Sequence, residues 1–231
     1  MTYIITILRK QIKETLKNKE VLIQFVMFPI LGIIMENSIE IEGMPENFFV
    51  TLFASMYIGM APLVCISAII SEEKEKNTLR VLMMADVTPW QYLLGTGSYV
   101  FMACMLGGTV FCGLLENVTA GRRFFFLLIL AAGIIASIVV GAAIGVGSRN
   151  QMAATSVTVP VMMVFSFLPM LSMFNDKVER VARFTYTEQI RILTGELESG
   201  GNYMENVVII LFNIVVFGVV FYTLYRKRGL V

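Results

Sequence analysis

Histidine is absent from this 231-residue chain, and cysteine occurs only three times. Without histidine, the chain lacks Ser-His and Cys-His nucleophilic pairs, histidine zinc sites and the H-E-x-x-H metalloprotease motif. The cysteines, Cys65, Cys104 and Cys112, all fall inside apolar runs, so they predict small buried side chains rather than a disulfide framework or a metal cluster. These absences argue against an enzyme.

Charge is also scarce. Charged residues make up 15% of the chain and apolar residues 57%, whereas a soluble domain is about 25% charged and about 45 to 50% apolar. The mean hydropathy is +0.76. Because a membrane helix needs about 20 apolar residues, a few spans consume most of this chain. The composition predicts an all-α integral membrane protein that forms a single transmembrane domain over residues 1–231.

Long apolar runs predict six membrane-spanning helices, and no segment alternates in the manner of a membrane barrel strand. The predicted spans cover residues 20–38, 48–70, 90–115, 124–147, 152–174 and 206–225. Residues 1–19 precede them and place apolar side chains at four-residue steps with basic residues opposite, which predicts an amphipathic helix at the membrane interface.

The distribution of basic residues predicts the orientation. An even number of spans puts both termini on one side, and twelve of the eighteen Lys and Arg residues fall on that side. By the positive-inside rule, both termini and the segment between the second and third spans are cytoplasmic. The longest segment on the other side, residues 175–206, mixes charge with scattered apolar residues, which predicts short helices that return toward the membrane surface.

The interiors of the predicted spans contain no Asp, Glu, Lys or Arg. Secondary transporters place ionisable groups there to carry a coupling ion or a proton, so this chain offers no such relay. It also lacks the G-x-x-x-x-G-K-[ST] loop that cradles the phosphates of ATP. If the protein transports a substrate uphill, the energy comes from another subunit.

Stripes of small, polar and methionine residues follow three of the spans. The fourth span has small residues at exact four-residue steps, which predicts close helix contact, either within the chain or in a dimer. These residues are Gly133, Ser137, Gly141 and Gly145. Stripes on the second and fifth spans predict either a substrate path or ordinary packing. They consist of Thr51, Ser55, Gly59, Thr155, Met162, Ser166 and Met170.

The cytoplasmic segment SEEKEKNTLRVLMMADVTP predicts a short helix over residues 72–84, with Ser71 as its N-cap and acids in its first turn. The run from Leu79 to Met84 is too apolar for a solvated hairpin, so it favours a docking surface for a partner protein. The residues expected to dock are Glu72, Glu73, Glu75, Thr78, Leu79, Leu82 and Met83.

The sequence EEKEKNTLRVLMMADVTPWQYLLG resembles the hallmark of permease subunits of ATP-binding cassette transporters of the ABC type-2 family. In that family an acidic, basic, acidic lead is followed by Gly-Thr-Leu, a Leu-rich turn and a Thr-Pro before the third span. Asn77 stands here where Gly is usual, and Gly95-Thr96 where a Lys often starts the third span. The resemblance extends to Pro29 in the first span and to the elaborated outer segment before the last one.

The resemblance implies that residues 72–84 form a coupling helix seated on a separate ATPase. It further implies a permease dimer, homomeric or heteromeric, with two ATPase copies that bind ATP and Mg. No cofactor is expected in this chain, and its other partner is the lipid bilayer rather than nucleic acid. The family predicts a multi-pass exporter in a bacterial cytoplasmic membrane. The apolar, Met-rich spans favour a hydrophobic or amphipathic peptide or drug as substrate; the alternative is a membrane-embedded sensing or immunity protein without transport.

Overall fold

The computed structural model describes residues 19–39, 45–84, 87–196 and 203–228. All regular elements in these ranges are α-helices, which confirms the predicted all-α class. They are α2 (Lys19–Ser38), α3 (Phe48–Glu75), α4 (Thr78–Met84), α5 (Pro89–Leu114), α6 (Ala120–Gly147), α7 (Gln151–Ser172), α8 (Asp176–Ala182), α9 (Tyr186–Gly195) and α10 (Met204–Arg228). The amphipathic helix predicted for residues 1–19 falls almost wholly outside the described ranges.

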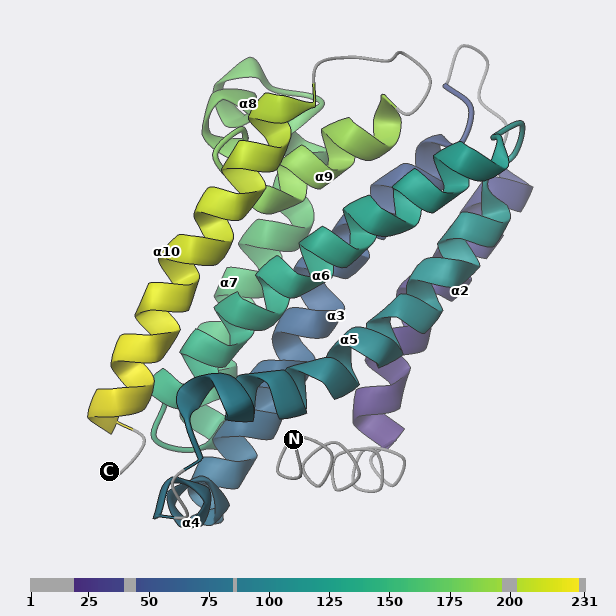
Figure 1. Cartoon of the computed structure of the whole chain (residues 1–231). Coiled ribbons are helices and arrows are strands. Elements are labelled where there is room, and N and C mark those ends of the chain that lie inside the picture. Colours follow the sequence, from purple (N-terminus) through teal and green to yellow (C-terminus); the bar gives the residue numbers. More distant parts are fainter. Residues whose placement is uncertain (1–18, 40–44, 85–86, 197–202, 229–231) are drawn as a thin grey trace.

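Six long helices lie alongside one another in a bundle, and three short ones lie at its ends (Figure 1). The short helix α4 lies at one end, together with the start of α2 and the end of α10 (Figure 1). We call this the α4 end. The helices α8 and α9 lie toward the opposite end, which we call the α9 end.

Five of the long helices, α3, α5, α6, α7 and α10, are long and apolar enough to cross a membrane. In α2 the apolar stretch within the described part runs over Phe25–Ser38, which is shorter than a full span. The chain is therefore a multi-pass membrane protein with five candidate spans, and the sixth stays a prediction.

The core forms where α6 packs closely against α3. A Cβ atom on Gly141 would lie 2.3 Å from the Leu63 carbonyl oxygen, so no larger residue fits without moving the backbone of α3. Gly145 approaches Ile70 and Ser67 in the same way. The small-residue ridge predicted on the fourth span is thus used for packing within the chain.

Three asparagines adopt left-handed backbone conformations where helices begin or end: Asn47, Asn77 and Asn117, with φ angles of 60°, 58° and 55°. Asparagine tolerates this region better than other non-glycine residues. The side chain of Asn47 also bridges two connections, because it donates to the Glu116 carbonyl oxygen and accepts from the Glu116 N–H. These turns fix how one span leads into the next.

Candidate functional site

The predicted coupling helix is divided into two parts at Asn77. α3 continues without a break to Glu75, and α4 begins at Thr78. Ser71 therefore lies inside α3 and donates to the Ala68 carbonyl oxygen, so the predicted N-cap is wrong. The helix ends four residues later because the left-handed conformation of Asn77 stops it there. Glycine, which the resemblance noted above would place at residue 77, adopts such a conformation readily.

One face of α4 packs into the bundle. Leu79 is fully buried, and Thr78 and Leu82 are half-buried. The Met83 side chain lies outside the described part of the structure. Of the residues predicted to dock, Leu79 therefore contacts this chain and is not available on its surface. Its side chain belongs to the core of the bundle.

The opposite face of α4 is exposed and apolar. Val81 is 57% exposed and Met84 is 67% exposed, and Arg80 lies on the same exposed side. The exposed ion pair between Glu72 and Lys76 lies just before α4, at the end of α3. Sequence reasoning included Val81 and Met84 in the apolar run but could not tell which residues of a seven-residue helix point outward.

The acids of the motif do not act as one group. Glu72 is partly exposed, whereas Glu73 is only 4% exposed and accepts a hydrogen bond from the Tyr92 hydroxyl at 2.6 Å. Glu75 accepts from the backbone N–H of Gln151, the first residue of α7, at 2.9 Å. The structure thus places Glu73 inside the chain and Glu75 against a neighbouring helix, although all three were predicted to face a partner.

Two residues of the predicted substrate path, Gly59 and Ser166, lie in a tight contact between α3 and α7, and a third, Ser55, is buried one turn before Gly59 in α3. A Cβ atom on Gly59 would lie 2.7 Å from the Phe165 carbonyl oxygen, and Ser55 is fully buried. Ser166 is also buried and donates to the Met56 carbonyl oxygen at 2.9 Å. Within this chain, the packing interpretation of these residues is the one that the structure supports.

The remaining four path residues are separated. Thr155 and Met170 are exposed on α7, and Met162 is half-buried where α7 meets the core. Thr51 lies at the start of α3 and lines a cavity of about 490 Å³ at the α9 end. The structure therefore does not gather the seven residues into one channel within the single chain.

At the α9 end, helix α9 is inserted among α3, α6, α7 and α10. Its first five residues, 186–190, are all buried. Tyr186 is hydrogen-bonded to Ser137 of α6 at 2.8 Å, and Ser137 donates to the Ile58 carbonyl oxygen of α3 at 2.6 Å. Burial raises the pKa of Tyr186, so its hydroxyl keeps the proton that these contacts need. Gly133 of α6 leaves room for Ile190 beside it.

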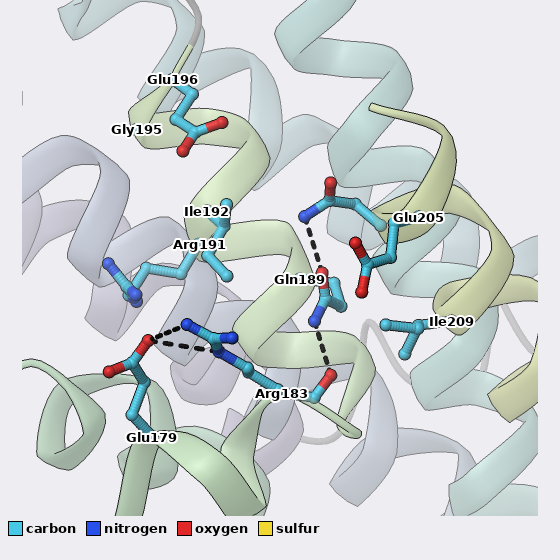
Figure 2. A pocket seen from close by; sticks show the side chains of 10 residues that line it. Glu179, Arg183, Gln189, Arg191, Ile192, Gly195, Glu196, Glu205 and Ile209 are labelled. Atoms are coloured by element: carbon cyan, nitrogen blue, oxygen red, sulfur yellow. Dashed lines mark hydrogen bonds and ion pairs between the residues drawn. The ribbon is translucent and has the colours of Figure 1, made fainter. Parts of the chain in front are cut away.

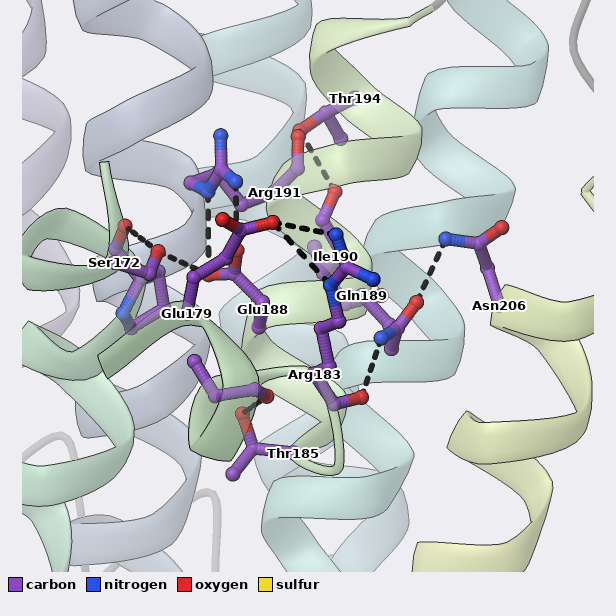
Figure 3. A network of polar contacts seen from close by, with 12 residues as sticks. Ser172, Glu179, Arg183, Thr185, Glu188, Gln189, Ile190, Arg191, Thr194 and Asn206 are labelled. Carbon is purple, nitrogen blue, oxygen red and sulfur yellow. Dashed lines mark hydrogen bonds and ion pairs between the residues drawn. The ribbon is translucent and has the colours of Figure 1, made fainter. Parts of the chain in front are cut away.

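A fully buried carboxylate, Glu188, forms the centre of a polar network in α9 (Figure 3). Its two oxygens accept from the Arg191 guanidinium at 2.6 and 3.2 Å, and Ser172 at the end of α7 donates to it at 2.8 Å. This pair was not predicted from the sequence, because α9 lies outside the predicted spans, whose interiors contain no ionisable groups. The spacing of an acid and a base three residues apart was the available signal.

Two cavities flank α9, and Arg191 lines both of them. The first, of about 510 Å³, opens between α8, α9 and α10, where Arg183 pairs with Glu179 and Gln189 reaches both Arg183 and Asn206 (Figure 2). The second is the cavity that Thr51 lines, and its wall is mixed apolar and polar.

Comparison with models of known protein families gives a match that covers nearly the whole chain. The model of the family described as "ABC-2 family transporter protein" matches residues 2–225. No curated protein matches the chain.

Proposed function

The chain belongs to the ABC-2 family of transporter proteins and is a membrane transport subunit, and from this premise we propose that it is the permease of an ATP-driven exporter. In this proposal the chain carries no ATP site and works as a dimer with two copies of a separate ATPase. The substrate is a hydrophobic or amphipathic molecule, a peptide or drug, that leaves a bacterial cell across the cytoplasmic membrane.

The observation that carries the proposal is the exposed apolar face of α4. Val81 and Met84 lie beyond the end of α3, away from the lipid-facing lengths of the long helices, and α4 is held from behind by the buried Leu79. An apolar face at such a place needs a protein partner, and the family supplies an ATPase. We therefore assign the contact to Val81 and Met84, with Arg80 and Glu72 at its rim.

Paired aspartate substitutions test this contact. Val81→Asp combined with Met84→Asp places charge where the partner would bury it, so the ATPase should no longer copurify with the permease. Val181→Asp is the matched control, because Val181 is 64% exposed on α8 at the other end of the molecule. Copurification that survives the paired change would contradict the contact.

A second experiment tests the orientation. The α4 end is cytoplasmic in our proposal, which the excess of basic residues on that side supports. In a background without the native cysteines, a cysteine at Asn37 should react with an impermeant thiol reagent added to intact cells, and one at Asn77 should not. The opposite labelling pattern would invert the topology.

The substrate path is proposed to lie between two copies of the chain. Thr155 and Met170 are exposed on α7, so a second copy could cover them. Cysteines at these two positions should crosslink between copies, while a cysteine at the exposed Val215 of α10 should not. Crosslinking at residue 215 alone would move the dimer contact to α10.

A further inference from the structure

The buried contact between Glu73 and Tyr92 joins the end of α3 to the start of α5. The two side chains are 4% and 0% exposed, and the hydroxyl donates to the carboxylate at 2.6 Å. The ring of Tyr92 packs against Tyr225 of α10, with the ring centroids 5.9 Å apart. The Tyr225 hydroxyl in turn donates to the Val87 carbonyl oxygen, in the connection between α4 and α5, at 3.4 Å.

The next two residues of α3 reach two further helices. Lys74 donates from Nζ to the Val146 carbonyl oxygen in the last turn of α6 at 3.1 Å. Glu75 accepts from the Gln151 N–H at the first turn of α7 at 2.9 Å. Each charge matches the dipole of the helix end that it meets, because cations favour C-termini and anions favour N-termini.

The negative charges of Glu73 and Glu75 do not stabilise α3 itself. Both lie in the last turn of that helix, where the macrodipole disfavours negative charge. Their partners lie on α5 and α7, so the acids stabilise contacts between helices at the expense of their own. Three successive residues, 73–75, thus connect the turn next to α4 with three different spans.

We propose that Glu73 is a positioning residue that transmits displacement of α4 to α5 through the Tyr92 hydroxyl. This inference rests on the proposed function, because it needs an ATPase that pushes on α4. A hydrogen bond between two buried groups resists separation more strongly than a solvated one. When the ATPase moves α4, the end of α3 therefore carries the start of α5 with it.

The test uses the permease and ATPase complex in lipid nanodiscs. Cys65, Cys104 and Cys112 are replaced by alanine, and an environment-sensitive dye is attached to a cysteine at the exposed Arg180 of α8, at the α9 end. The fluorescence change on adding ATP reports whether movement at α4 reaches the other end. Recovery of the unsubstituted complex is measured first, and its failure would reject the proposed function itself.

Tyr92→Phe removes the donor and keeps the ring. Tyr92→Phe alone leaves the buried Glu73 carboxylate with one hydrogen-bond donor fewer. The double variant, Glu73→Gln combined with Tyr92→Phe, is therefore measured as well, since it also removes the carboxylate. Tyr57→Phe is the matched control, since Tyr57 of α3 donates to the Cys104 carbonyl oxygen of α5 at 3.2 Å, between the same two helices but far from α4. Glu73→Gln alone keeps an oxygen acceptor and serves as the conservative variant.

We expect the ATP-dependent change to fall about tenfold in the double variant, which loses one buried hydrogen bond to a charged group. ATPase binding and the thermal unfolding midpoint should stay as in the unsubstituted complex. Tyr57→Phe and Glu73→Gln should keep the response. An undiminished response in the double variant overturns the proposal, and so does loss of folded protein in that variant, which would assign the bond to stability alone.

Discussion

At the α4 end, charged side chains reach from one helix to the ends of others, whereas at the α9 end Glu188 and Arg191 pair within a single helix. Lys74 and Glu75 contact residues more than seventy positions away in the sequence. The pair in α9 is three residues apart, and cavities of about 490 and 510 Å³ lie on either side of that helix.

The difference concerns where the bundle can move. The contacts at the α4 end join several spans to one turn, so a force applied there is shared among them. At the α9 end the inserted helix carries its own charge compensation, so a displacement of α9 would break its hydrogen bonds to Ser137, Ser172 and Asn206 but would not separate Glu188 from Arg191. We expect force to enter at the α4 end and the larger rearrangement to occur at the α9 end.

The largest effect should come from breaking the pair in α9. Glu188→Ala leaves the Arg191 guanidinium partly buried without its carboxylate, which should cost about 3 to 5 kcal/mol of unfolding free energy. Thermal unfolding in detergent measures this loss. Glu179→Ala, which breaks the exposed pair with Arg183, is the control and should cost about 1 kcal/mol or less. If the two variants lose the same unfolding free energy, the Glu188–Arg191 pair does not stabilise the fold more than the exposed pair does.

The next effect concerns the two faces of α4. Leu79→Ala removes a fully buried side chain and should lower the unfolding free energy by about 2 to 4 kcal/mol. Val81→Ala on the exposed face should change it by about 0.5 kcal/mol or less. The same unfolding measurement compares them. A larger loss at Val81 would reverse the assignment of buried and exposed faces and with it the proposed docking surface.

The smallest effect should appear at the turn between α3 and α4. Asn77→Ala places a residue that disfavours the left-handed region at a φ of 58°, which should cost about 1 kcal/mol. Asn77→Gly should be neutral or slightly stabilising, because glycine adopts this conformation without a Cβ clash. If alanine and glycine behave alike, the turn does not depend on the left-handed conformation and the α4 end is less tightly fixed than we describe.

Hydropathy located the five candidate spans because lipid demands a continuous apolar run, but it could not place their ends. The second span was predicted to end at residue 70, while α3 continues to Glu75. The hydrophobic thickness of a membrane sets the length of the apolar run, but the helix itself can continue beyond that run. The helix ends where a backbone conformation stops it, at Asn77.

The candidate sites were predictable only in part, since burial depends on residues far away in the sequence. Glu73 and Glu72 are adjacent and chemically identical, but Glu73 is buried and accepts a hydrogen bond from Tyr92, 19 residues later. Likewise, the sequence allows Ser55 and Ser166 to line a substrate path. In the structure both are buried, and α3 and α7 approach closely at Gly59. A single sequence contains the small residues but not the pairing of the helices that they allow.

The contacts at the end of α3 also set an order of assembly during synthesis. The last turn of α3 leaves the ribosome well before Gln151 of α7, and Tyr225 of α10 comes last of all. Since the Tyr225 hydroxyl donates to Val87 in the connection that follows α4, this contact can form only after the final span has been synthesised. The contacts at the α4 end are therefore complete only when the whole chain is present.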